Sequence, residues 1–159
     1  MGLRKYGFPT GSASVGGFRY NACVQAVELG RRLGIEPERP VLAESVVTDY
    51  LLEQATEEGA LWRQQAHLAR VVTFDPTEGI RDEGILPIAP FVDSGGPPAV
   101  AVIVETEPGG NLQPCVYVRR DGRVTEHTLP PAFQHDFRTP EHRAELESVL
   151  HGLVPATVA

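Results

Sequence analysis

The pattern of hydrophobic and polar positions is clearest between Pro97 and Leu129, where it predicts three antiparallel strands. Residues 99–104 form an unbroken apolar run, which is typical of a strand buried on both faces. The Pro-Gly-Gly-Asn cluster at 108–111 predicts the first reversal, and Asp121-Gly122 predicts a two-residue type I′ turn. We therefore expect a β-meander whose first strand lies at the centre of a sheet.

The predicted turn at Asp121-Gly122 also sets the register of its hairpin. If Arg120 faces Arg123, every further pair is fixed, because strand side chains alternate between the two faces of a sheet. We expect the more apolar face to meet the core; it carries Val116, Val118, Thr125, His127 and Leu129. We expect the other face to meet water; it carries Tyr117, Arg119, Val124 and Glu126.

Apolar side chains recur at helical spacing in four further segments. The first three are 18–33, 41–57 and 60–72, with Gly59 leaving open whether 41–72 is one helix or two; we expect two. The fourth starts at Thr139, where a capping hydroxyl is followed by a proline suited to the first helical position. In the first segment the apolar stripe is Ala22, Ala26, Leu29 and Leu33.

The chain between the helical segments and the meander is rich in turn residues and prolines. Residues 75–79 predict a turn and 80–84 a charged loop, while the two prolines within 85–92 favour an edge strand or a packed extended segment. The fold class predicted is α+β: an antiparallel meander of three to five strands packed by N-terminal helices and one C-terminal helix. We expect a single domain over 18–154, a flexible Gly/Ser-rich arm over 1–17 and a tail over 155–159.

Composition and charge narrow the function classes. The 159 residues carry a net charge of −7, which argues against binding to nucleic acid, because that binding requires a basic surface. No apolar run approaches the length of a membrane span and no signal peptide is evident, so we expect a cytoplasmic protein with no membrane partner. Cys23 and Cys115 lie in no CxxC pair, so we expect two reduced, buried thiols, no metal and no cofactor.

One cluster of polar residues near the C-terminus has side chains capable of acid–base chemistry. Histidine titrates near neutral pH and binds metals, and His127, His135 and His142 lie close in sequence with Asp136 between the last two. Their spacing does not place two histidines on one helical face, as a zinc helix requires. We take these four residues as the candidate catalytic group.

A second cluster is acidic and lies around the turn at 75–79. Carboxylates brought together on a loop can bind a basic partner or a cation. The spacing lacks the order of a calcium-binding loop. The candidate partner-binding residues are Asp75, Glu78, Asp82 and Glu83.

These observations support three hypotheses about function. The first is a small acidic cytosolic protein that acts without catalysis by binding another protein in an accessory, chaperone-like or toxin-neutralising role; a basic protein is one candidate partner. The second is a small enzyme or ligand-binding domain that uses the His/Asp cluster in a cavity between sheet and helices. The third is a structural subunit of a homo-oligomer, for which we expect an apolar helix face or sheet edge paired across a symmetry axis.

Overall fold

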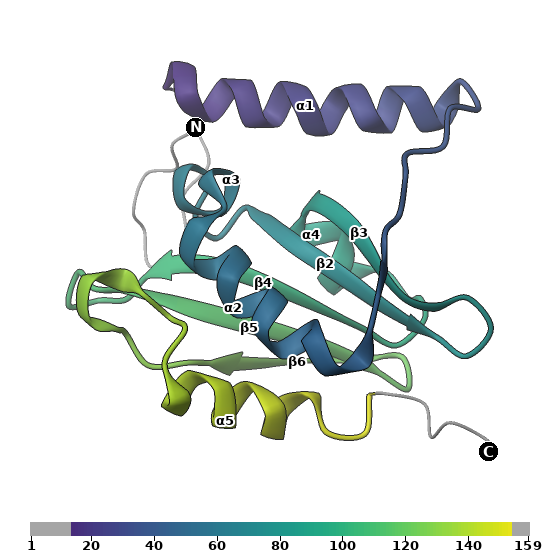
Figure 1. Cartoon of the computed structure of the whole chain (residues 1–159). Helices are drawn as coiled ribbons and strands as arrows, with labels where there is room; N and C mark the ends of the chain where they lie inside the picture. The colour runs from purple at the N-terminus through teal and green to yellow at the C-terminus, as the bar shows by residue number, and fades with distance from the viewer. Residues whose placement is uncertain (1–13, 154–159) are drawn as a thin grey trace.

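The computed structural model describes residues 14–153, so most of the predicted arm and the whole predicted tail lie outside the described residues. The described chain forms five α-helices, two short 3₁₀ turns and one sheet (Figure 1). The helices are α1 (Val15–Arg32), α2 (Val47–Glu57), α3 (Gly59–Arg63), α4 (Ile88–Asp93) and α5 (Pro140–Leu150), and the 3₁₀ turns are η2 (Glu44–Val46) and η3 (Phe133–His135). The strands are β1 (Val41–Leu42), β2 (Leu68–Asp75), β3 (Gly79–Pro87), β4 (Ala99–Thr106), β5 (Leu112–Arg120) and β6 (Arg123–Thr128).

The six strands form one antiparallel sheet in the order β1-β3-β2-β4-β5-β6. The predicted α+β class is confirmed, but six strands exceed the three to five expected, because β1 and the β2–β3 hairpin extend the sheet beyond the meander. The predicted central strand is β4, which lies between β2 and β5 and is buried from Ala99 to Glu105.

The main hydrophobic core lies between the sheet and the two helices α2 and α5, which pack on the same face (Figure 1). Val102 of β4 and Val116 of β5 point to this face, since strand side chains alternate. Leu51 of α2 and Leu146 of α5 are fully buried against them. Each such side chain stabilises the fold by roughly 1.5–3 kcal/mol through removal of apolar surface from water.

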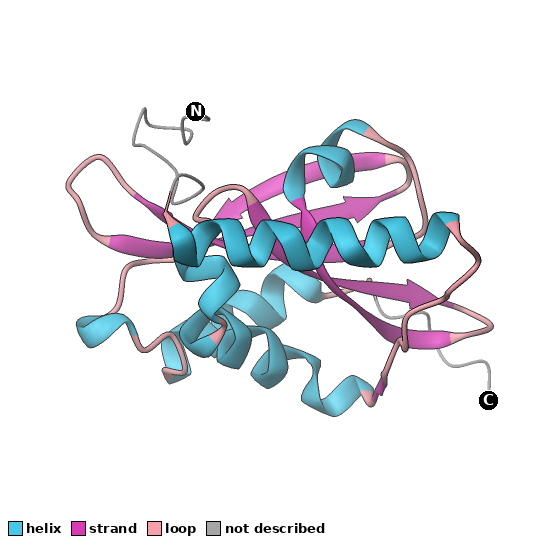
Figure 2. Ribbon diagram, turned by 90° about the horizontal axis from the view of Figure 1, so that it is seen from above, coloured by secondary structure: helices cyan, strands magenta, loops and turns pink. Residues whose placement is uncertain are grey.

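The opposite face of the sheet carries a smaller apolar cluster. Phe91 of α4 packs there on small side chains of the central strands, including Ala69 and Ala101. Helix α1 lies over the β3 end of the sheet on this side, and Figure 2 shows it crossing the molecule from its N-terminal end, which contacts α3. The molecule therefore has a tightly packed layer on one face and a partial layer on the other.

The β5–β6 hairpin has the predicted register. Arg120 pairs with Arg123, and the pairing continues to Val116 opposite His127. Asp121 and Gly122 both have positive φ, 51° and 73°, as a type I′ turn requires. The apolar face of the hairpin meets the core as expected, but the expectation that the other face is wet is wrong at Arg119, which is 7% exposed because α4 and the loop after it cover it.

Four predicted segments differ from the structure, wholly or in part. The predicted helix over 60–72 ends at Arg63, and the chain from Leu68 to Asp75 is strand β2. The segment 41–57 contains β1 and η2 before α2, and 80–84 belongs to strand β3 rather than to a loop. The proline-containing stretch 85–92 is divided: Pro87 ends β3, and α4 follows directly. Strand β1 pairs only with Ile80 and Arg81 of β3, so residues 85–87, within the predicted edge strand, have no partner strand on their outer side among the described residues.

The C-terminal helix α5 begins as predicted. Thr139 is the N-cap, its hydroxyl accepts from the backbone N–H of His142, and Pro140 occupies the first helical position. No helix within residues 14–153 combines the length and apolar character that crossing a bilayer requires. The domain boundaries and the cytoplasmic location stay predictions.

Candidate functional site

The structure gives each histidine of the predicted catalytic cluster a separate set of partners. His142 is 2% exposed; its Nδ1 lies 2.7 Å from the Thr139 hydroxyl and its Nε2 2.8 Å from the Pro130 carbonyl oxygen. His127 is on β6, 3.0 Å from the Thr125 hydroxyl, and lines a shallow cleft with the end of α5. His135 lies in η3, where its ring meets the Trp62 ring edge-on at 5.5 Å.

Asp136, the fourth residue of that cluster, serves its own loop. Its carboxylate accepts hydrogen bonds from the backbone N–H and the guanidinium of Arg138, which lower the pKa of Asp136. Within residues 14–153 no cluster of three metal-ligating side chains includes any of these four residues. His142 and Asp136 make their hydrogen bonds within the connection between the sheet and α5.

The four acidic residues of the predicted partner-binding surface already have partners within the chain. Asp75 accepts from the hydroxyl and N–H of Thr77 and closes the β2–β3 turn. Glu78 and Glu83 both form salt bridges with Arg39, each at 3.3 Å. Asp82 is 7% exposed and lies on the core side of the sheet, where it accepts from the Tyr50 hydroxyl at 2.6 Å and lies 3.6 Å from Arg70. Three of the four surround the turn, and Asp82 is part of the interior.

A cleft with a volume of about 860 Å³ lies between α1 and the second face of the sheet. One wall is the underside of α1, from Val24 to Arg32. The other wall comes from β2, β3, α4 and the loop that follows α4. Its apolar lining includes Val24, Leu29, Val71, Leu86, Pro90 and Phe91. This volume falls within the range of about 300–1,000 Å³ that is typical of ligand sites.

Arg119 lines the cleft, and its hydrogen bonds hold the end of α4 and the loop that follows it in place. Its guanidinium donates to the carbonyls of Pro97, Phe91 and Ser94 at 3.0, 3.3 and 3.4 Å and stacks over the Phe91 ring at 4.5 Å. Burial lowers the pKa of Arg119, and no carboxylate among the described residues offsets that effect. Gly96 lets the loop approach this side chain closely, since a Cβ at that position would lie 2.9 Å from the guanidinium carbon and would displace it.

The charges that line the cleft are mainly positive. Arg31, Arg32 and Arg119 face it together with Glu28 and Glu83. Both carboxylates are already in salt bridges, Glu28 with Arg32 and Glu83 with Arg39. The cleft therefore combines apolar walls with an excess of guanidinium groups.

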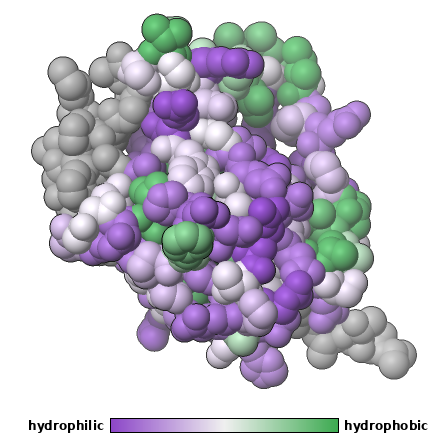
Figure 3. Space-filling model, turned by 60° about the vertical axis from the view of Figure 1, so that its left-hand side comes forward, coloured by the Kyte–Doolittle hydropathy of each residue, from purple (hydrophilic) through white to green (hydrophobic). Residues whose placement is uncertain are grey.

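Helix α1 buries only Gly17 among its 18 residues. It is attached near its N-terminal end, where the Gln64 side chain donates to the Gly17 carbonyl at 2.5 Å and the Tyr20 hydroxyl lies against Gly59. The apolar stripe predicted to be buried is largely on the outer side of α1 instead: Leu33 is 70% and Leu29 58% exposed, although Leu29 also borders the cleft. Phe18, which continues the outer side toward the N-terminus, is 69% exposed. Hydrophobic patches are visible along the top of the molecule, where α1 runs (Figure 3). An amphipathic helix of a globular protein normally buries its apolar side, whereas α1 buries neither side.

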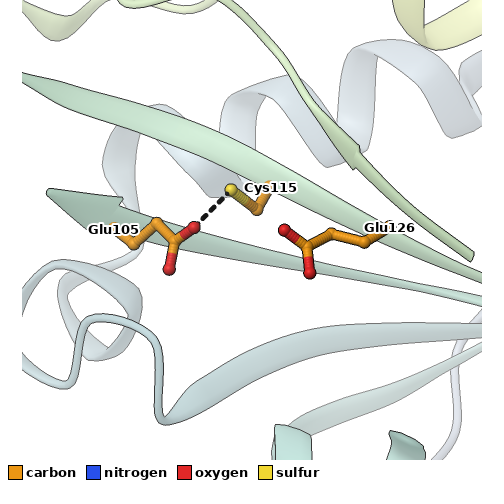
Figure 4. A group of neighbouring side chains, drawn as sticks. All are labelled: Glu105, Cys115 and Glu126. Carbon is orange, nitrogen blue, oxygen red and sulfur yellow. Dashed lines mark hydrogen bonds between the residues drawn. The ribbon is translucent and has the colours of Figure 1, made fainter. Parts of the chain in front are cut away.

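A compact polar group lies on the same face of the sheet, away from the cleft lining. Glu105 of β4, Cys115 of β5 and Glu126 of β6 each offer one ligand atom, and these atoms lie within 4.8 Å of one another (Figure 4). The Cys115 thiol donates to Glu105 Oε1 at 2.8 Å. Burial, together with the hydrogen bond to Glu105 and its charge, raises the pKa of the Cys115 thiol. Cys115 is buried as predicted, whereas Cys23 is exposed.

Comparison with models of protein families, with curated proteins and with solved structures found no match to this chain. Any inference about its function therefore depends on the cleft, on α1 and on the group formed by Glu105, Cys115 and Glu126. The sequence predicts the helix over 18–33 but not its exposure, and it predicts neither the residues of the cleft nor the polar group. The exposed stripe of α1 has the same spacing as a buried one, and the residues of the cleft come from segments that only the folded sheet brings together.

Proposed function

We propose that this protein acts without catalysis by binding an extended segment of another protein in the cleft between α1 and the sheet. The observation that carries the proposal is the position of α1, which spans the cleft while burying only Gly17. Without a ligand, a helix with apolar residues on both sides gains little stabilisation from this position, because neither side is removed from water. A bound segment supplies the missing contacts for its underside.

The shape of the cleft favours a polypeptide over a compact ligand. Along α1 its lining extends from Val24 to Arg32, which corresponds to about 12 Å of helix. That length accommodates about four residues of an extended chain.

The charge of the cleft favours an acidic segment. The carboxylates of Glu28 and Glu83 are engaged by Arg32 and Arg39, which leaves Arg31 to face a ligand, because the Arg119 guanidinium already donates to three backbone carbonyls. Guanidinium groups bind carboxylates through paired hydrogen bonds. We therefore expect the partner to present apolar side chains with at least one carboxylate. This differs from the basic partner that the acidic turn predicts, because the carboxylates of that turn are held by Arg39 and Thr77.

The test uses fluorescence anisotropy with short labelled peptides in which leucine alternates with aspartate, and with matched peptides in which lysine replaces aspartate. Val24→Asp and Arg31→Glu change the α1 wall of the cleft, while Arg19→Glu makes the same charge change on an exposed position of α1 outside the lining. We expect the aspartate peptides to bind the parent protein and Arg19→Glu equally, and the two cleft variants at least about tenfold more weakly, a loss of about 1.4 kcal/mol. Equal binding by all variants, or equal binding of the lysine peptides, would refute the proposal.

A second candidate function, assembly of a homo-oligomer, is favoured by the outer stripe of α1. The stripe consists of Val15, Phe18, Ala22, Ala26, Leu29 and Leu33 and is nearly symmetric about position 24. In an antiparallel pair of α1 helices, Val15 of one copy would lie opposite Leu33 of the other, and the small Ala22 and Ala26 would allow close approach at the centre. Such self-complementarity is what a two-fold interface requires.

Sedimentation equilibrium distinguishes this candidate. Phe18→Glu places a charge within the stripe, and Val27→Glu places the same charge on an exposed α1 position outside it. We expect a dimer for the parent protein and Val27→Glu, and a monomer for Phe18→Glu. A parent protein that is monomeric at concentrations up to about 100 μM, where an interface of roughly −5.5 kcal/mol is half assembled, would exclude assembly through the stripe.

A further inference from the structure

The group formed by Glu105, Cys115 and Glu126 is built from three neighbouring strands. In the β4–β5 ladder Cys115 pairs with Ile103, and Glu105 is two residues further along the same face. In the β5–β6 ladder Glu126 pairs with Tyr117, which is two residues from Cys115. Because side chains two residues apart share a face, the sheet itself holds the three ligand atoms together.

The burial of this group is unusual for its chemistry. Glu105 is 1% exposed and Cys115 is fully buried, while Glu126 is exposed and connects the group to solvent. A buried carboxylate is costly unless both oxygens are bound by hydrogen-bond donors or a cation. Glu105 Oε1 accepts from the Cys115 thiol, but Oε2 is buried and has no hydrogen-bond partner.

The arrangement of the three side chains indicates that a cation can bind the unpaired Oε2 of Glu105. Figure 4 shows the carboxylates of Glu105 and Glu126 approaching each other from opposite sides, with the Cys115 sulfur above the gap between them. In tetrahedral zinc sites, bonds of 2.0–2.3 Å place ligand atoms about 3.3–3.5 Å apart. The three ligand atoms here lie within 4.8 Å of one another, so small side-chain rotations suffice to reach that spacing.

We propose that Glu105, Cys115 and Glu126 form a binding site for a divalent zinc ion. Thiolate favours zinc over magnesium or calcium, and carboxylate oxygen is an accepted zinc ligand, so one sulfur and two oxygens select zinc among the common divalent cations. On binding, the Cys115 thiol gives its proton to solvent and the sulfur bonds the metal. The unpaired Oε2 of Glu105 gains a cation, and three protein ligands leave a fourth position for water.

A bound ion would also join the strands at the β6 end of the sheet. It would connect β4, β5 and β6 through side chains, in addition to their backbone ladders. The site is independent of the cleft, because its three residues are absent from the cleft lining. The proposal therefore does not depend on the proposed peptide-binding function.

The experiment is titration of the purified, metal-stripped full-length protein with Zn²⁺ by isothermal calorimetry, followed by Co²⁺ substitution and absorption spectroscopy. The site variants are Cys115→Ser and Glu126→Gln. The matched controls are Cys23→Ser, which removes an exposed thiol, and Glu53→Gln, which neutralises an exposed carboxylate on α2. A further control, His67→Gln with His151→Gln, removes the two exposed histidines, which are the most accessible to adventitious zinc among the described residues. Because Glu126 is exposed, Glu126→Gln is expected to fold normally.

We expect one Zn²⁺ per chain, a thiolate-to-cobalt charge-transfer band that Cys115→Ser abolishes, and zinc affinity at least about 10- to 100-fold weaker in both site variants, since changes outside the ligand set alone can cost that much. The three controls should bind as the parent protein does. Absence of stoichiometric binding, or binding that survives both site variants and is lost in the histidine control, would overturn the proposal.

Discussion

His142 provides the sharpest test of whether the C-terminal histidines have a structural role. The side chain is 2% exposed and makes two hydrogen bonds, to the Thr139 hydroxyl and to the Pro130 carbonyl. Because the Pro130 carbonyl can only accept, Nε2 carries the proton and Nδ1 accepts from Thr139. The ring also packs against Phe137, with ring centroids 5.7 Å apart.

His142→Ala removes both hydrogen bonds, each worth about 1 kcal/mol, and leaves a small cavity beside Phe137. We expect the free energy of unfolding to fall by about 3 kcal/mol, which lowers the midpoint of thermal unfolding by about 6–12 °C in a protein of this size. His142→Gln should recover part of the loss, because glutamine at the third helical position completes a capping box with Thr139.

The assay is urea unfolding followed by circular dichroism, with His127→Ala as the matched control. His127 lies on β6 with one hydrogen bond, so its removal should cost less than about 1 kcal/mol. Equal losses in the two alanine variants, or a His142→Ala protein as stable as the parent, would refute the structural role assigned to His142.

Three further predictions concern other parts of the fold. Tyr50→Phe removes the donor to the buried Asp82 carboxylate and should cost about 1–3 kcal/mol in urea unfolding; an unchanged midpoint would contradict the burial of Asp82. Gly122→Ala forces alanine into a φ of 73° and should lower the free energy of unfolding by about 1 kcal/mol or more. An alanine variant as stable as the parent protein would argue against the type I′ turn. Hydrogen bonds from Thr77 and from the Glu78 backbone lower the pKa of Asp75 from 3.8 to about 2. That stabilisation is present above about pH 4 and is lost as pH falls toward 2, so Asp75→Asn should flatten the fall of the thermal midpoint across that window.

The parts of the fold that could be predicted are those in which local chemistry determines structure. The Asp121-Gly122 turn leaves one register for its hairpin, and the Thr139-Pro140 pair marks a helix start whatever packs on it. Strand β2 could not be predicted in this way. Its residues are buried on both faces, so its apolar positions do not alternate and match a helical stripe equally well.

The candidate sites were less accessible from sequence because they depend on long-range pairing. The hairpin register already places Tyr117 and Glu126 on one face, and Cys115 follows two residues away. Glu105 joins them only through the β4–β5 register, which the Pro-Gly-Gly-Asn reversal does not fix uniquely. The exposure of the α1 stripe depends on which elements the helix meets, and no local signal carries that information.

The attachment of α1 determines which kinds of competitor can act on this protein. Residues 33–40 join α1 to β1, so the helix docks as an intramolecular ligand whose effective concentration is on the order of millimolar. A separate helix at micromolar concentration therefore cannot displace α1 by occupying its place. A chain that enters beneath α1 need not compete with it, because it adds a layer between helix and sheet and gains contacts from both.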